Sequence, residues 1–406
     1  MKKLVTLMAA VLILALVASA GIAEQVPQIV VSRWAGNHAD DMKSVAADFE
    51  GANVLIDDIG YENLRQKQIQ SLTTTGDYDV IYFQEIWAKD YIRNGWLEPM
   101  DEYIAESGFD LDSLLPSFVE VNQQDGKTYG LPAMTHAYIM VYDGKTLEED
   151  GKSIPQTPEE LVELAKFYKE KGSGIAIPAG QGQAAADVFS SILFGSDGDY
   201  FDENGKLALT SEPVLYAAEI WDQLCEYSVS GATAWMNEES AEAIRTGVAP
   251  LGITISDTNF LDLDPDRSVI VDSVVYGPIP SRNELVGLAG VWSFGIAANS
   301  KNKEAAFEFI KWMIAPEQDK AMALLNSQTS ALPATAEDPA VLEKFPFMTA
   351  ASQSMVKAKF NPLNPGASEL MPALQAALSE LAISDATPLD VFTQLQNDLE
   401  DKVVSE

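Results

Sequence analysis

The chain has 406 residues, of which 47% are hydrophobic, and it carries a formal net charge of -35 at pH 7. The hydrophobic content excludes a disordered chain, and the length exceeds one ordinary core, so we expect two domains. So acidic a surface repels nucleic acid and anionic lipid, which excludes nucleic acid as a partner. The single cysteine, Cys225, excludes an intramolecular disulfide, and its apolar helical surroundings predict a buried thiol.

The first residues predict export from the cytoplasm. Lys2 and Lys3 precede the uncharged apolar run Leu4–Val17, and small residues follow it. This order is typical of a secretory signal peptide, and cleavage is expected after Ala20 or Ala23. The run is too short to span the roughly 30 Å hydrocarbon core of a bilayer. No cysteine lies near the cleavage site, so we expect a periplasmic protein without a lipid anchor.

Strand and helix patterns then alternate along the chain. Short apolar runs predict strands, and apolar residues at helical spacing predict helices between them. This β-α-β-α-β order predicts a mostly parallel sheet with helices on both faces, and ligands of such sheets collect beyond the carboxyl ends of the strands. The predicted strands are Gln28–Ser32, Val54–Ile59 and Asp79–Phe83, and the predicted helices are Ala39–Glu50, Glu62–Leu72 and Trp87–Asn94.

The alternation restarts after Leu131-Pro132. Cap residues, several followed by proline at the first helical position, predict further helix starts at Thr157, Ser211, Asn302 and Thr387. The further predicted strands are Ile175–Pro178 and Ala249–Ile255.

Three proline-bearing stretches interrupt the pattern, near Leu131–Ala133, Pro278–Pro280 and Leu332–Ala334. Each is interpreted as a passage of the chain between two lobes with a cleft between them. The expected division is a signal peptide at 1–23, an N-terminal lobe of 24–131 plus 280–332, and a C-terminal lobe of 133–278 plus 334–406.

Five segments carry a resemblance to a known family: Asp77–Ile81, Gly95–Asp101, Asp125–Pro132, Gly290–Ile296 and Ser300–Ala306. Their order and spacing resemble the extracellular solute-binding proteins of ABC sugar importers, family 1, which includes maltose-binding protein. The resemblance runs from the signal peptide to the C-terminus. It implies an α/β, type II periplasmic-binding-protein fold with two lobes joined by three hinge crossovers, which close on ligand by hinge bending.

The same resemblance implies what the protein does and with what. It implies a receptor, not an enzyme, that binds a sugar or oligosaccharide and delivers it to the ABC permease subunits in the membrane. A monomer without a cofactor is expected.

Candidate ligand contacts follow from the chemistry of a sugar, whose apolar faces suit aromatic rings and whose hydroxyls suit polar side chains. Most candidates stand at the carboxyl ends of predicted strands, and the resemblance favours positions 37, 38, 136 and 292. Several also have a plainer explanation, since Asn37 can cap a helix, Glu85 can begin one, and Trp34 can be core. The candidates are Trp34, Asn37, His38, Gln84, Glu85, Trp87, His136, Ser256, Asp257 and Trp292.

Motifs of other chemistries are incomplete. Gly180–Ala185 follows a strand as a dinucleotide loop would, but no clear acid-ended strand follows about 20 residues later. Asp262, Asp264 and Asp266 have calcium-loop spacing, yet Arg267 stands where an EF-hand needs glycine. A solvated acidic loop is the preferred interpretation, and no metal site is predicted.

Two other functions stay open from the sequence. One is a receptor of the same fold for a polyamine or a peptide, for which Glu85 and Asp257 are the visible carboxylates. The other is a polysaccharide-active enzyme, which would need a matched carboxylate pair. Arg33 also leaves open an acidic sugar as the ligand.

Overall fold

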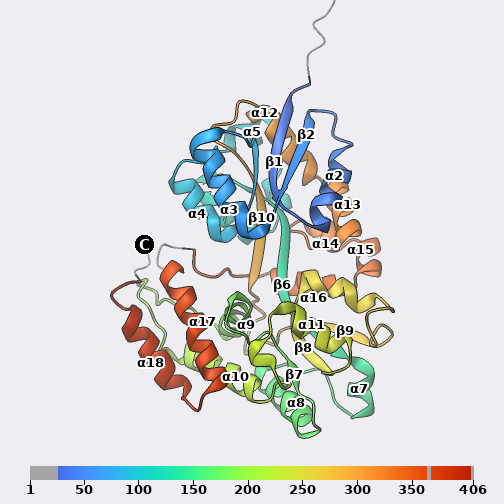
Figure 1. Cartoon of the computed structure of the whole chain (residues 1–406), viewed down its shortest axis with the longest axis vertical. Coiled ribbons are helices and arrows are strands. Elements are labelled where there is room, and N and C mark those ends of the chain that lie inside the picture. The colour runs from blue at the N-terminus through green and yellow to red at the C-terminus, as the bar shows by residue number, and fades with distance from the viewer. Residues whose placement is uncertain (1–25, 364–366, 404–406) are drawn as a thin grey trace, which may run out of the picture.

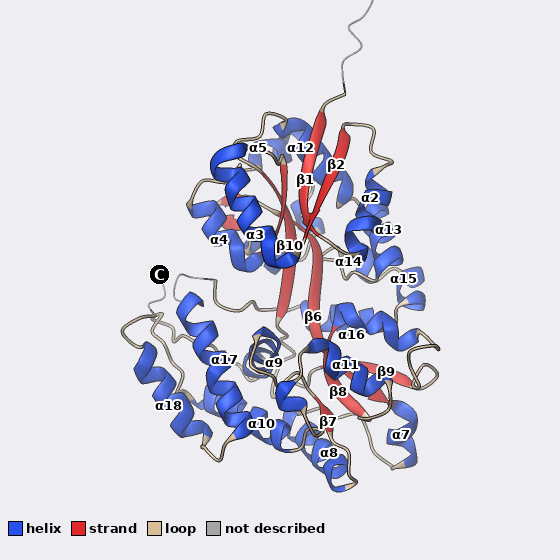
Figure 2. Cartoon of the chain, viewed as in Figure 1, coloured by secondary structure: helices blue, strands red, loops and turns tan. Residues whose placement is uncertain are grey.

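The computed structural model describes residues 26–363 and 367–403, so the predicted signal peptide lies outside the described residues. Figure 1 shows an upper and a lower half joined by two long strands, β6 (Leu131–Asp143) and β10 (Ala289–Ile296). Helices cover the strands of both halves (Figure 2), as an α/β chain requires. None of the helices in the described part of the chain has the length and apolar character needed to cross a membrane.

The upper half contains the predicted β-α-β-α-β unit. Strand β1 (Gln28–Trp34) lies between β2 (Asn53–Ile59) and β3 (Val80–Gln84), and both pairings are parallel. The sheet is nevertheless mixed, because β10 joins β3 in antiparallel orientation. The expectation of a mostly parallel sheet is therefore corrected: a strand that returns from the other half runs against the first three.

The lower half continues the same sheet through β6. The distal part of β6 pairs antiparallel with β8 (Leu251–Ile255) and β9 (Val274–Pro278), and β7 (Ile175–Ala176) pairs parallel with β8. The strand order is β2-β1-β3-β10-β6-β8-β7, with β9 on β6, and β4 (Gln123–Gln124) and β5 (Lys127–Thr128) form a separate hairpin.

The helices divide between the halves in Figure 1, and some lie near the junction. The upper helices are α2 (Asn37–Ala46), α3 (Tyr61–Gln70), α4 (Glu85–Arg93), α5 (Asp101–Ser107), α12 (Lys303–Met313) and α13 (Pro316–Asn326). The junction helices are α14 (Pro333–Ala336), α15 (Pro339–Lys344) and α16 (Phe347–Met355), and α6 (Pro116–Glu120) packs with α15 and α16 in one hydrophobic cluster. The lower helices are α7 (Gly144–Glu149), α8 (Pro158–Glu170), α9 (Gln183–Phe194), α10 (Glu212–Glu226), α11 (Asn237–Arg245), α17 (Ala367–Ile383) and α18 (Pro388–Leu399).

The predicted caps are partly confirmed. The hydroxyls of Thr157 and Thr387 accept hydrogen bonds from the backbone N–H groups three residues on, so both cap their helices. Ser211 and Asn302 stand at the N-cap positions of α10 and α12 without such a bond, which corrects those two predictions. The amide of Asn302 is used elsewhere, donating to the backbone oxygen of Gln28.

The chain passes between the halves along β6 and β10. Pro278 is still paired with Ile139 on the distal part of β6, and Leu288 packs in the lower hydrophobic core. The second passage therefore lies later than the proline-bearing stretch at 278–280, within β10. The chain just before the third proline-bearing stretch, Leu332–Ala334, lies against β6. There Thr135 donates its N–H to the backbone oxygen of Thr329 at 3.0 Å.

Two buried residues of α10 belong to the core of the lower half. Cys225 is buried on α10, as predicted, and burial raises the pKa of its thiol. Trp221, one turn earlier, is fully buried and donates its indole N–H to the backbone oxygen of Leu378 on α17. This helix pair ties residues near the C-terminus to the lower half.

Candidate functional site

A pocket of about 350 Å³ lies where the two halves meet. The upper half lines it from β1, α3 and β3, the lower half from α9, α11 and the end of β8, and strands β6 and β10 run along it. Its lining is Trp34, Tyr61, Gln84, Met134, His136, Tyr138, Gln183, Ala184, Asp187, Met236, Asn237, Ile255, Asp257 and Trp292. Five of the ten predicted contacts are in this lining, at positions 34, 84, 136, 257 and 292.

Aromatic rings form the upper wall of this pocket. Trp292 stacks on Tyr82, with ring centroids 5.2 Å apart and planes 11° from parallel. Trp87 meets Trp292 edge-on at 5.7 Å, and Trp34 and Tyr61 lie 6.0 and 6.1 Å from it. Trp292 is only 5% exposed, so one face belongs to the core while the side chain still borders the pocket.

The wall along β6 follows strand alternation. Met134, His136 and Tyr138 are two residues apart and therefore share a face of the strand. The imidazole of His136 lies over Gly290, where an added Cβ would be 2.1 Å from Nε2. The absence of a side chain at Gly290 therefore makes room for this ring. Burial lowers the pKa of His136 to about 4, so its imidazole is neutral at neutral pH.

We expect Gly290→Ala to cost about 1–3 kcal/mol of unfolding free energy and to weaken ligand binding, because the imidazole of His136 must move. Gly277→Ala is the matched control, since its Cβ would meet nothing closer than a ring carbon of Tyr142 at 3.8 Å. Denaturant unfolding and calorimetric titration measure both quantities. In a His136→Ala background the cost of Gly290→Ala should shrink; equal costs in both backgrounds would contradict the contact.

Polar groups form the lower wall. Asp187 on α9 accepts hydrogen bonds from Gln183 and Asn361, both at 2.6 Å, and from the phenol of Tyr138 at 3.3 Å. Burial raises the pKa of Asp187 to about 7 despite these donors. Asn237 on α11 donates to the same phenol at 3.3 Å.

Asp257 stands just beyond the end of β8, as the sequence placed it. Its carboxylate lines the pocket, and burial, followed by the nearby Glu238 carboxylate, raises its pKa to about 6. Across the pocket, the phenol of Tyr61 donates to Gln84 at 3.1 Å. The pocket therefore has an aromatic upper wall and an acidic, hydrogen-bonding lower wall.

Three predicted contacts lie outside the pocket lining because the fold uses them elsewhere. The buried carboxylate of Glu85 accepts the backbone N–H of Val291 at 2.8 Å, at the point where β10 has left β3. The hydroxyl of Ser256 accepts the N–H of Ala137 at 3.3 Å. Trp87 is buried in the aromatic cluster behind the wall. A polar residue directly after a strand satisfies backbone groups in two of these cases.

Asn37 and His38 line a neighbouring pocket of about 560 Å³ together with Phe260 and residues 325–327. Asn37 begins α2, and its N-cap position is held by Gly36. The ring of His38 lies 5.1 Å from that of Trp34, which lines the junction pocket. Burial, then the charge of Arg33, lowers the pKa of His38 to about 4.

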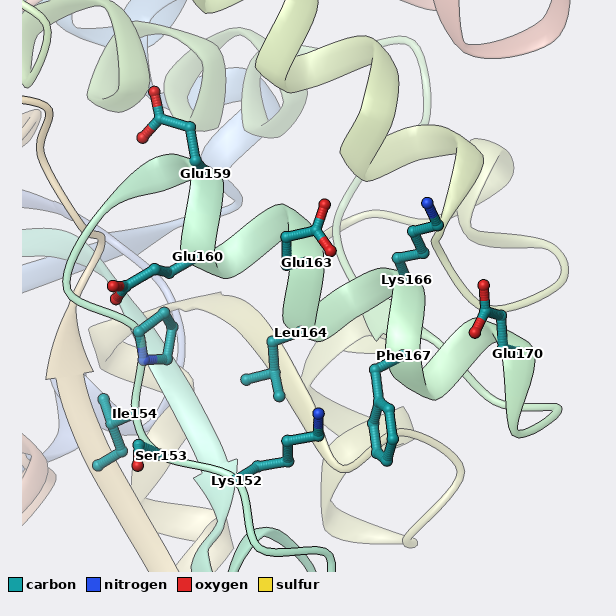
Figure 3. Close-up of a pocket in the computed structure, with 11 residues that line it drawn as sticks. Lys152, Ser153, Ile154, Glu159, Glu160, Glu163, Leu164, Lys166, Phe167 and Glu170 are labelled. Carbon is teal, nitrogen blue, oxygen red and sulfur yellow. The ribbon is translucent and has the colours of Figure 1, made fainter.

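A larger hollow of about 670 Å³ lies on the lower half, away from the junction. Figure 3 shows that its lining comes from α8 and the loop before that helix. The amine of Lys152 covers the ring of Phe167 at 3.7 Å, so this ring already has a cation on its face. No strand end contributes to this hollow, and none of the predicted contacts lies in it.

The acidic loop predicted to be solvated is partly internal. Asp262 is 2% exposed; it accepts hydrogen bonds from Asn259 and Tyr276 and lies 3.8 Å from Arg245. The interpretation is corrected for this residue, whose carboxylate anchors the loop, while Asp266 is exposed. Among residues 26–363 and 367–403, no group of His, Cys, Asp or Glu is arranged to hold a metal ion.

Nine lining residues were not predicted from the sequence. Tyr138 could have been found by alternation from His136, and Tyr61 by its place just after β2. Gln183 lies in the stretch Gly180–Ala185, whose position after β7 was the useful signal. Asp187 lies one turn beyond Gln183 on α9. For Asn237 we find no local signal.

Comparison with known proteins identifies the family to which this chain belongs. Residues 35–320 match the family model described as bacterial extracellular solute-binding protein. The chain is 24% identical, over 75% of its length and 72% of the relative's, to a Sinorhizobium fredii protein named as an amino-acid ABC transporter periplasmic-binding protein. It is 27% identical to a maltotriose-binding protein of Pyrococcus abyssi, over 73% of this chain and 64% of the relative.

Solved structures share the fold. A solute-binding protein from Agrobacterium radiobacter K84, in complex with ribitol, has a TM-score of 0.78 at 23% identity, covering 92% of this chain and 98% of that one. Maltose-bound MalE3 of T. maritima has a TM-score of 0.79 at 23% identity, covering 92% and 99%. The predicted type II periplasmic-binding-protein fold and the predicted family are thus confirmed. The chain belongs to the bacterial extracellular solute-binding proteins.

Proposed function

We propose that this chain is the periplasmic receptor of an ABC importer, which binds a carbohydrate or polyol between its lobes and delivers it to the membrane permease. The pocket at the junction of the two halves carries this proposal. One wall presents the rings of Trp34, Tyr61 and Trp292, which suit the apolar faces of a sugar. The opposite wall presents Asp187 and Asp257, which suit its hydroxyls.

The relatives support this choice of ligand. Proteins similar to this chain are named for maltotriose and mannitol, and solved structures of the same fold hold ribitol, mannitol and maltose. The relative named for amino acids makes an amino-acid receptor the second candidate. The proposed receptor is a monomer that leaves its ligand chemically unchanged.

The proposed mechanism is closure of two lobes around the pocket. The proposed lobes are those expected from the sequence, 24–131 plus 280–332 and 133–278 plus 334–406, after removal of the signal peptide at 1–23. One boundary is changed: the second passage is placed within β10, because Leu288 packs in the lower core. Strands β6 and β10, which connect the halves, act as hinges in this proposal. The third connection is proposed near Leu332–Ala334, after the segment in which Thr329 contacts Thr135 of β6.

A thermal-unfolding screen with sugars, polyols and amino acids tests the proposed function. A true ligand present at a hundredfold excess over its Kd raises the unfolding free energy by roughly 2.7 kcal/mol. The same ligand should reduce the radius of gyration in small-angle scattering and be recovered intact. The proposal fails if only amino acids or polyamines stabilise the protein, or if the sugar is cleaved.

A further inference from the structure

We infer that the ligand is an amino sugar or amino polyol, whose protonated amine binds between Asp187, Asn237 and Asp257 on the lower wall of the pocket. This inference rests on the proposed function and narrows its ligand class. The lower wall of the pocket offers several hydrogen-bond acceptors and few free donors.

The protein satisfies these acceptors only in part, since Oδ1 of Asp187 receives Gln183 and Asn361 and the carboxylate of Asp257 receives its own backbone N–H. Among the described residues, no other side chain donates a hydrogen bond to the carboxylate of Asp257. Oδ1 of Asn237 is buried without a donor. Oδ2 of Asp187 receives only the phenol of Tyr138, at 3.3 Å. All three residues line the pocket, so a ligand there can donate hydrogen bonds to the lone pairs that the protein leaves free.

The three residues surround the phenol of Tyr138. The phenol of Tyr138 is within 3.3 Å of both Oδ2 of Asp187 and Nδ2 of Asn237. It also lies within the electrostatic reach of Asp257, since burial, Asp187 and Asp257 together raise its pKa well above the usual value. A protonated amine has three N–H donors and no acceptor, which matches three acceptors in one corner.

The charges of the pocket also favour a cationic ligand. Its lining holds the carboxylates of Asp187 and Asp257 and neither lysine nor arginine. Burial raises the pKa of both carboxyls, the behaviour of acids whose charge lacks a counter-ion. A neutral ligand would leave these carboxyls partly protonated, whereas an ammonium group would favour their ionised form and pair with it.

Arg33 does not supply the missing cation, and an acidic sugar is disfavoured. Its guanidinium is fully buried, lies 4.7 Å from the ring of Trp34 and 4.9 Å from that of Tyr82, and is outside the pocket lining. The rings of Trp34, Tyr61 and Trp292 on the pocket side can receive the ring of a sugar, and aromatic faces also attract cations.

Calorimetric titration of the mature chain at neutral pH with matched sugars tests the inference. Glucosamine, galactosamine and mannosamine are each compared with the parent hexose and the N-acetyl derivative, which lack the charge. We expect at least one amine to bind roughly ten- to a hundredfold more tightly than its two neutral counterparts.

Variants connect this preference to the pocket. Asp257→Asn should lower the affinity for that amine by about ten- to a hundredfold and leave the N-acetyl derivative almost unaffected. Asp187→Asn should act in the same direction, with thermal unfolding as the check on its fold. Asp266→Asn, the same change on an exposed carboxylate, is the control and should leave both affinities unchanged.

The results distinguish a failure of this inference from a failure of the proposed function. If a neutral hexose binds as tightly as its amine, or if Asp257→Asn affects both equally, this inference is wrong and the proposed function stands. If no sugar binds while amino acids such as lysine do, both are wrong.

Discussion

Replacing Trp292 by alanine is expected to lower the unfolding free energy by about 3–5 kcal/mol and also to weaken ligand binding by roughly 1–3 kcal/mol. The stability loss follows from its place in a cluster, stacked on Tyr82 and edge-on to Trp87. The affinity loss follows from its position in the pocket lining, where it can face a sugar ring. Denaturant unfolding and calorimetric titration of the same variant measure the two losses.

Trp312→Ala is the matched control for this substitution. Trp312 lies half-buried on α12 against Phe49, with ring centroids 5.3 Å apart, and does not line the pocket. It should lose stability without losing affinity. Unchanged affinity in Trp292→Ala would restrict Trp292 to a core role, and unchanged stability would contradict the stack on Tyr82.

Most helices and strands of this fold could be predicted from local sequence patterns. The predicted strand Gln28–Ser32 is extended to Trp34 in the structure, and the helix predicted to start at Asn302 begins at Lys303. The antiparallel pairing of β10 with β3 could not be predicted from local sequence. Strand order depends on which surfaces pack together after the chain has passed to the lower half and returned. Proline-bearing breaks indicated passages between halves, yet the second passage is made by β10, a strand without proline.

The site was predictable where it follows strand ends and not where it follows helix packing. Trp34, Gln84 and Asp257 stand at the ends of strands and line the pocket, as the sheet rule requires. Asp187 and Asn237 are brought there by the packing of α9 and α11, which local sequence does not encode. The same rule also selected Glu85, because position after a strand does not distinguish a ligand contact from a bond to the backbone.

Glu85 has a further consequence for stability. Burial raises the pKa of its carboxyl to about 8, although it accepts the N–H of Val291. Burial likewise raises the pKa values of Asp187 and Asp262 to about 7. Around neutral pH the folded protein therefore holds protons that the unfolded chain has already lost. Unfolding releases these protons, so rising pH favours the unfolded chain.

We expect the unfolding free energy to fall by about 3 kcal/mol as the pH rises from 6.5 to 8. His38 and His136 act in the opposite direction, mainly below pH 7, because their pKa values fall from 6.5 to about 4 on folding. Urea unfolding at several pH values measures the slope. Glu85→Gln keeps an oxygen for Val291 and should remove about half of the slope, whereas Glu317→Gln, an exposed carboxylate at the start of α13, should leave it intact. A flat profile in the native sequence, or an unchanged slope in Glu85→Gln, would show that Glu85 is ionised in the folded protein.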